Sequence, residues 1–219
     1  MSLIRRLEQR LESLLDGVVG SVFRGQLHPS ELAQRIIRQA DLDGVEMDEG
    51  GMRVPNRYVL AVHPDDLGGQ TPPPALRTEL AGLVEELAFE RGWRLDGPAE
   101  VVIISNPVAP HGNPKCDGQF VAGRRPAWAR LSGDANHDIT VNRAVIGRNP
   151  DADVVVKGEH VSRHHAVVWR QDQRVLISDL GSSNGTLVDG VRVDRRPVEA
   201  SIPCTLTFGD MSFLLQGPG

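Results

Sequence analysis

The chain has 219 residues, 40% of them hydrophobic and 24% charged, and a formal net charge of −5 at pH 7. That length and apolar content are enough for two small globular domains, and the weakly acidic balance disfavours a protein that coats nucleic acid. The two cysteines exclude a disulfide framework or a zinc knuckle, and no stretch reaches the roughly 18 consecutive apolar residues of a membrane span.

The amino-terminal stretch "MSLIRRLEQRLESLL" distributes charges among its apolar residues, whereas a secretory signal has a basic start and then an apolar block. We therefore expect a soluble, cytoplasmic protein without membrane insertion, which a partner can recruit to the inner face of the membrane.

Residues 1–105 are predicted to form a small α+β domain whose helices cover one face of a sheet. Apolar residues recur at helical spacing in three segments, at Ile4–Val22, from Pro29 to about Ala40, and from Pro74 to Gly92. Strands are predicted within Met52–Val62 and at "EVVII", because both are rich in β-branched or aromatic residues. The connecting "HPDDLGGQTPPP" has the composition of a loop, and its "HPDD" is typical of a turn.

Residues 106–125 are rich in proline and glycine and lack apolar periodicity, so we predict a flexible linker there. Beyond it, from residue 126 to residue 219, short apolar segments such as "HAVVWR", "RVLISDL" and "CTLTFGD" alternate with turn residues. Regular short strands of this kind predict an all-β sandwich as the second domain.

Three polar segments lie at predicted strand ends of this sandwich, namely Gly147–Arg148, Ser162–His165 and Ser182–Thr186. Loops at the end of a sandwich are its usual binding surface, since the strands fix their positions. Arginines, hydroxyls and an amide are mostly hydrogen-bond donors, and the arginines add positive charge. These segments therefore predict an anion-binding site.

The arrangement "GR…SRHH…SSNGT" resembles the signature of forkhead-associated (FHA) domains, which bind phosphothreonine peptides. The resemblance covers roughly residues 126–216. It implies that the peptide is contacted by Arg148, Ser162, Arg163, Ser183 and Asn184. It also implies that Gly147 and Gly185 supply tight backbone turns, that His165 supports the loop from behind, and that Asn184 uses both ends of its amide to hold the peptide backbone.

A second interpretation of this region is a metal site built from His160, His164 and His165. No carboxylate or thiol accompanies these histidines at a defined spacing, and strand alternation would point His164 and His165 to opposite faces. We therefore predict no metal and no cofactor.

The first half, through "RLEQRLESLLDGVVGSVFRGQLHPSELAQRIIRQAD" and "RGWRLDGPAEVVI", is similar to the amino-terminal domain of actinobacterial FhaA-type proteins. That family combines this domain with an FHA domain and accompanies Ser/Thr protein kinases connected to cell-wall synthesis and division. The resemblance implies a phosphothreonine-containing partner, which would be a kinase, a pseudokinase or a kinase substrate. It gives no partner for the first domain.

No nucleophile and base can be assembled from the sequence, and it has neither a Walker-type loop nor a dinucleotide fingerprint, so we predict a protein that is not an enzyme. The alternative function is RNA binding through a KH-like first domain. The acidic balance and the missing basic loop make nucleic acid the less favoured partner.

Thr71 lies in "GGQTPPPAL", a stretch that we expect to be exposed and accessible to a kinase. A phosphate there would stand close to the start of a predicted helix, where negative charge is tolerated. Thr71 is therefore a candidate phosphoacceptor.

Overall fold

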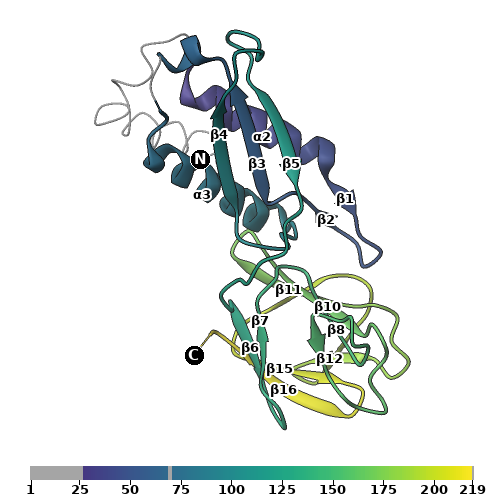
Figure 1. Ribbon diagram of the computed structural model, residues 1–219. Coiled ribbons are helices and arrows are strands. Elements are labelled where there is room, and N and C mark those ends of the chain that lie inside the picture. Colours follow the sequence, from purple (N-terminus) through teal and green to yellow (C-terminus); the bar gives the residue numbers. More distant parts are fainter. Residues whose placement is uncertain (1–26, 69–70, 219) are drawn as a thin grey trace. The chain divides into compact units, whose positions relative to one another are not determined.

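The computed structural model describes residues 27–68 and 71–218 (Figure 1). Within them the chain forms two compact units: 27–45, 54–68, 71–87 and 95–123 make up unit 1, and 46–53, 88–94 and 124–218 make up unit 2. The helix predicted at Ile4–Val22 lies outside the described residues. Unit 1 corresponds to most of the predicted α+β domain and unit 2 contains the predicted sandwich.

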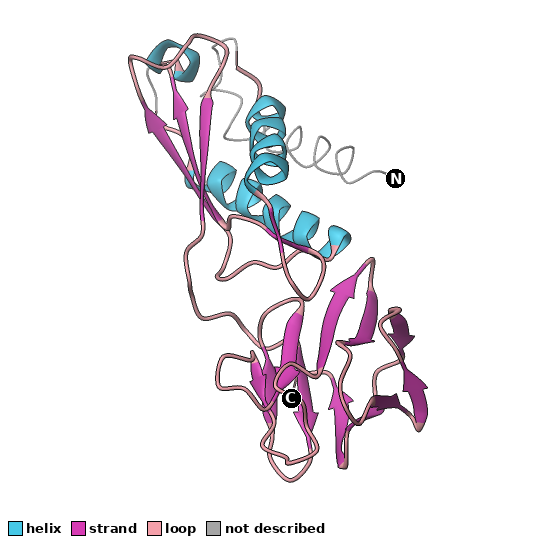
Figure 2. Ribbon diagram, turned by 90° about the vertical axis from the view of Figure 1, so that its right-hand side faces the viewer, coloured by secondary structure: helices cyan, strands magenta, loops and turns pink. Residues whose placement is uncertain are grey.

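Unit 1 combines helix α2 (Pro29–Asp43) and most of helix α3 (Pro74–Arg91) with the three-stranded sheet β4-β3-β5, and the last turn of α3, from Ala88, belongs to unit 2. Figure 2 shows the helices beside the sheet. Strand β3 (Arg57–Val62) pairs in parallel with β4 (Glu100–Ser105) and antiparallel with β5 (Lys115–Gln119). The short 3-10 helix η2 (Pro64–Leu67) follows β3 directly. The short strands β1 (Val45–Glu46) and β2 (Met52–Arg53) pair with each other, and all their residues except Val45 belong to unit 2. The predicted α+β class is confirmed.

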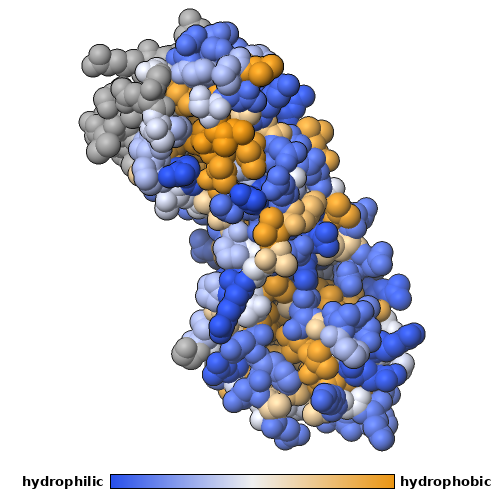
Figure 3. All heavy atoms as spheres, viewed as in Figure 1, coloured by the Kyte–Doolittle hydropathy of each residue, from blue (hydrophilic) through white to orange (hydrophobic). Residues whose placement is uncertain are grey.

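The two faces of this sheet differ in burial. Tyr58, Leu60 and Val62 alternate along β3 and are fully buried, which places the core of the unit on one face. The opposite face of β3 and β4 is only partly covered, and Ile104 of β4 keeps 42% of its surface exposed. An apolar area is visible over these strands in Figure 3. The sheet therefore has one buried and one partly exposed apolar face.

Residues with suitable capping properties mark the start of α2 and the end of α3. Pro29 occupies the first turn of α2, where a missing N–H costs nothing, and the side chain of His28 accepts a hydrogen bond from the N–H of Ser30. Gly92 follows α3 with φ of +66°, a left-handed conformation that glycine adopts without steric strain. The predicted end of this helix is confirmed.

The predicted flexible linker over residues 106–125 is wrong for its central part, because β5 belongs to the sheet of unit 1. Its residues pair with Arg57–Ala61, and the side chain of Asn56 accepts a hydrogen bond from the N–H of Val121 at 2.9 Å. A side chain at Gly118 would collide with Asp43 and Pro55, so glycine permits this close packing. Backbone pairing with β3, rather than apolar burial, orders this segment.

Unit 2 is a sandwich of two sheets, which confirms the predicted all-β class. The five-stranded sheet has the order β14 (Val198–Ala200), β11 (Arg174–Asp179), β10 (Ala166–Gln171), β8 (Ala144–Gly147) and β9 (Val154–Val155). The six-stranded sheet has the order β13 (Val191–Val193), β12 (Thr186–Val188), β15 (Cys204–Phe208), β16 (Met211–Gln216), β6 (Ala129–Ser132) and β7 (His137–Ile139). All pairs are antiparallel except β8 with β9.

The core of the sandwich lies between the sheets. Ile146, Val168 and Ile177 of the five-stranded sheet and Leu206 and Phe208 of the six-stranded sheet belong to one cluster of buried residues. This packed interior fixes the strand ends, and the strand ends in turn fix the loops between them. None of the described helices is long and apolar enough to cross a membrane.

The difference between the two faces of the unit 1 sheet leads to a stability prediction. Leu60→Ala is expected to lower the free energy of unfolding by about 2–5 kcal/mol, because it leaves a cavity in a closed core. Ile104→Ala on the partly exposed face is the matched control, with an expected loss below about 1 kcal/mol. Urea unfolding followed by helical circular dichroism measures both, and equal losses would contradict the assignment of the faces.

Candidate functional site

A cavity of about 570 Å³ lies at the strand ends of the sandwich in unit 2. Three segments line it: Arg148–Asn149 after β8, Glu159–His164 ahead of β10, and Ser183–Asn184 between β11 and β12. The five residues predicted as peptide contacts all line this cavity, and they are Arg148, Ser162, Arg163, Ser183 and Asn184. The fold thus brings together three polar segments that are separated in the sequence.

Backbone hydrogen bonds join the first two segments. The N–H of Arg148 donates to the carbonyl of Ser162 at 3.0 Å, and the N–H of Asn149 donates to the carbonyl of Arg163 at 3.2 Å. A Cβ atom at Gly147 would lie 2.0 Å from the carbonyl oxygen of Arg163. Gly147 is the last residue of strand β8, and its lack of a side chain allows the backbone of Arg163 to lie close to it. The prediction of a tight turn at Gly147 is wrong.

His165 joins the second segment to the third. Its buried ring accepts a hydrogen bond from the N–H of Ser162 at Nδ1, at 3.0 Å, and Nε2 lies 3.1 Å from the carbonyl of Gly185. Since a carbonyl only accepts, the ring proton is on Nε2 and the imidazole is neutral. Gly185 has φ of +87°, as expected for the predicted turn. His165 thus connects the two loops from the buried side and is not among the residues that line the cavity.

Burial lowers the pKa of His165 below the ordinary value of 6.5, although the hydrogen bond to Gly185 and the nearby Asp179 act in the opposite direction. A charged ring could not accept the hydrogen bond from the N–H of Ser162. The geometry and the lowered pKa therefore agree on a neutral histidine.

Asp179, at the end of β11, organises the third segment and was missed in the sequence. Its buried carboxylate accepts hydrogen bonds from the hydroxyls of Ser182 and Thr186, at 2.6 and 2.7 Å, and from the N–H groups of Gly181 and Ser182. Burial would raise the pKa of Asp179, but these hydrogen bonds outweigh it and the pKa is lowered. An aspartate two residues before the "GSSNGT" turn is the signal that could have identified it.

The side chains of Ser162 and Asn184 already form hydrogen bonds within the protein. The hydroxyl oxygen of Ser162 accepts from the N–H of Ser183 at 3.1 Å, and Nδ2 of Asn184 donates to the carbonyl of His160 at 2.9 Å. One of the two N–H donors of the Asn184 amide therefore helps to hold the loop, which leaves its second N–H and its oxygen for a peptide. The hydroxyl hydrogen of Ser162 keeps its capacity to donate.

Two arginines give the cavity its positive charge. Arg148 and Arg163 are both exposed, and among the described parts of the chain neither guanidinium has an ion-pair partner. Glu159 adds one negative charge to the lining, while His164 lies 3.2 Å from Asp151. Two unpaired guanidinium groups beside several neutral donors make this cavity suitable for a multiply charged anion.

Thr71, the candidate phosphoacceptor, is not among the residues that line this cavity. Thr71 is exposed and precedes α3 in unit 1. Its phosphorylation remains a prediction.

A β-sandwich with this donor-rich cavity has the architecture of an FHA domain, and residues 144–209 match the family model of the FHA domain. Residues 4–117 match the model described as "FhaA, N-terminal domain". Because that match covers more than half of the chain, the chain belongs to the family defined by the FhaA N-terminal domain. The match ends within β5, at residue 117, and so includes the first three residues of that strand.

Curated relatives share sequence with part of the chain. The transcriptional regulatory protein EmbR of Mycobacterium tuberculosis is 29% identical over an alignment of 136 residues, and the alignment covers 54% of this chain and 34% of EmbR. The glycogen accumulation regulator GarA of the same organism is 29% identical over 110 residues, which are 49% of this chain and 60% of GarA. The matches thus span about a third of EmbR and three fifths of GarA.

Solved structures that resemble this chain include the FhaA FHA domain complexed with the intracellular domain of Rv3910. It shows 22% identity and a TM-score of 0.37, and covers 42% of this chain and 100% of that one. Mycobacterium tuberculosis EmbR in complex with a low-affinity phosphopeptide shows 24% identity and a TM-score of 0.39, and covers 71% of this chain and 39% of that one.

The hydrogen bonds of Asp179 give a testable prediction. Hydrogen bonds to a charged group contribute about 1.5–3 kcal/mol each, so Asp179→Ala is expected to destabilise unit 2 by at least about 2 kcal/mol. Asp134→Ala removes an exposed aspartate from the same unit and should change stability by less than about 0.5 kcal/mol. Urea unfolding followed by tryptophan fluorescence distinguishes the two variants. Equal stabilities would show that the carboxylate does not organise the turn.

The neutral state of His165 predicts how stability depends on pH. Its pKa is lower in the folded protein than the ordinary value of 6.5, so the unfolded chain binds more protons in the interval between the two values. The contribution of His165 to stability is therefore complete above about pH 6.5 and decreases as the pH falls below it. An NMR titration of the histidine ring protons should give a His165 midpoint below 6.5, and a midpoint at or above this value would contradict the assignment.

Proposed function

We propose that this chain is a non-enzymatic adaptor whose FHA domain binds phosphothreonine peptides of a Ser/Thr kinase, a pseudokinase or a kinase substrate. The observation that carries the proposal is the cavity of unit 2, in which two unpaired arginines and several neutral donors surround one space. A phosphorylated threonine carries a charge of about −1.5 to −2 at pH 7 and three acceptor oxygens, and it matches this donor set.

Four residues of the cavity have defined roles in this proposal. Arg148 presents a planar guanidinium that bonds two phosphate oxygens at once, and Arg163 adds a second positive charge. Ser162 donates its hydroxyl hydrogen to the phosphate, since its oxygen already accepts from Ser183. Asn184, held by the carbonyl of His160, contacts the peptide backbone with the remaining part of its amide.

The expected affinity is modest. Three or four charge-assisted hydrogen bonds of about 1.5–3 kcal/mol each are offset in part by desolvation of the phosphate and by ordering of the peptide. The remaining free energy is on the order of −8 kcal/mol, which corresponds to a micromolar dissociation constant. Such an affinity suits a reversible signalling contact in the cytoplasm.

The partner class follows from the site and from the relatives together. One related solved structure is a complex of EmbR with a phosphopeptide, and another is a complex of the FhaA FHA domain with the intracellular domain of Rv3910. By analogy, we propose that the partner of this chain is a protein phosphorylated on threonine. Recruitment to the inner face of the membrane would then depend on that partner.

The proposal predicts the effect of Arg148→Ala. Loss of the guanidinium should weaken binding of a phosphothreonine peptide, selected from a degenerate phosphopeptide library, by about 10- to 100-fold. The melting temperature should stay nearly unchanged, because Arg148 is exposed and has no ion-pair partner among the described residues. Fluorescence anisotropy measures the affinity, and the unphosphorylated peptide serves as the ligand control.

Two further variants serve as protein controls. Arg148→Lys retains the charge but not the planar fork, so it should restore only part of the affinity. Arg174→Ala removes an exposed arginine from β11, outside the cavity, and should bind like the wild type. Wild-type affinity in Arg148→Ala would show that the cavity is not the phosphopeptide site.

A further inference from the structure

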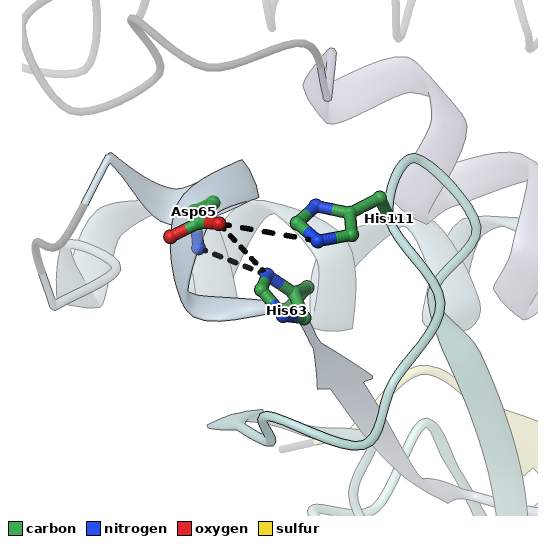
Figure 4. Close-up of side chains that lie close together, drawn as sticks. All are labelled: His63, Asp65 and His111. Carbon is green, nitrogen blue, oxygen red and sulfur yellow. Dashed lines mark hydrogen bonds and ion pairs between the residues drawn. The ribbon is translucent and has the colours of Figure 1, made fainter.

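Unit 1 contains a cluster of three potential metal ligands that is independent of the FHA domain. His63 follows β3, Asp65 lies in η2, and His111 lies in the loop between β4 and β5 (Figure 4). Strands β3 and β4 are parallel, so their carboxyl ends lie at the same edge of the sheet and bring these loops together. The fold thus joins two histidines that are 48 positions apart in the sequence.

The three side chains converge on a small volume. The Oδ2 atom of Asp65 lies 3.6 Å from Nδ1 of His63 and 3.9 Å from Nε2 of His111. One ligand atom from each of the three residues lies within 4.8 Å of the others, and the two imidazole rings are 3.6 Å apart between centroids. Ligands at about 2.0–2.1 Å from a tetrahedral zinc ion lie roughly 3.3 Å apart, so small side-chain movements would complete the coordination.

A buried carboxylate stands behind the cluster. Asp66 is almost fully buried, its Oδ2 accepts a hydrogen bond from the N–H of Gly112 at 2.8 Å, and its Oδ1 lies 3.7 Å from Nδ1 of His111. Histidines that bind metals generally direct their second ring nitrogen toward a carboxylate or a carbonyl, which fixes the orientation of the ring. Asp66 is placed to orient His111 with its Nε2 atom toward Asp65.

We propose that His63, Asp65 and His111 form a binding site for a divalent transition-metal ion, with Zn²⁺ as the ion that fits the ligands best. Two imidazoles and one carboxylate are the ligand types that zinc accepts, whereas Mg²⁺ and Ca²⁺ prefer oxygen ligands alone. Asp65 and His111 are exposed by 77% and 61% at their side chains, so an ion can reach them from solvent. Three protein ligands leave the fourth position to water.

The competing explanation is purely local. His63 accepts a hydrogen bond from the N–H of Asp65 at 3.2 Å and so caps η2, a role that requires no metal. Binding of a metal through Nδ1 would replace this hydrogen bond, because a neutral imidazole nitrogen has one lone pair. The cap does not account for the position of His111 beside Asp65, whereas the hydrogen bond to Gly112 already accounts for the buried Asp66. A bound ion would connect the β4–β5 loop to η2 and so hold together two segments that are far apart in the sequence. Metal binding is therefore expected to stabilise unit 1.

The test uses the full chain and Zn²⁺ alone. Isothermal titration calorimetry should give one zinc ion per chain, and Co²⁺ should give the visible absorption of a tetrahedral site. His111→Ala should weaken zinc binding by at least about tenfold, and Asp66→Asn by about 10- to 100-fold. His137→Ala removes a histidine of unit 2 and should bind zinc like the wild type.

Circular dichroism without metal verifies that each variant is folded, and Asp65→Asn provides a second ligand variant at an exposed position, with the same expected loss as His111→Ala. Zinc should raise the melting temperature of the wild type and not that of His111→Ala. The proposal is overturned if the wild type binds no zinc, or if His111→Ala and Asp65→Asn both bind it as tightly as the wild type.

Discussion

The candidate binding cavity depends on one buried imidazole. His165 receives a hydrogen bond from the N–H of Ser162 and donates one to the carbonyl of Gly185, so a single ring fixes the separation between two loops. Its own backbone is held between strands, since its N–H donates to Ile146 and its carbonyl accepts from Leu180. The loops are therefore placed by the interior of the sandwich. Exposed side chains such as Arg148 then need only to project from fixed backbone positions.

Much of the fold follows from local patterns in the sequence. Helical spacing and a terminal glycine predicted α3, and alternating or β-branched segments predicted the sandwich. The order of "GR", "SRHH" and "SSNGT" predicted which loops line the cavity, because loops that connect strands of one sandwich end have little freedom to lie elsewhere. Motifs at strand ends are informative for this reason.

The remaining features depend on contacts between distant segments, which local patterns do not encode. Strand β5 is short and polar, and its order comes from pairing with β3 rather than from its own composition. Gly147 owes its importance to the carbonyl of Arg163, which lies 16 positions later in the chain. Likewise, His111 stands in a stretch without periodicity, and only the parallel pairing of β3 with β4 places it beside His63.

The carboxylate of Asp179 has a consequence for the kinetics of recognition. Because it already receives four hydrogen bonds from the Ser182–Thr186 turn and its flank, that turn loses its conformational freedom when the protein folds rather than when a ligand arrives. A preorganised loop needs little rearrangement during encounter, which favours rapid association and leaves the differences between ligands to their dissociation rates.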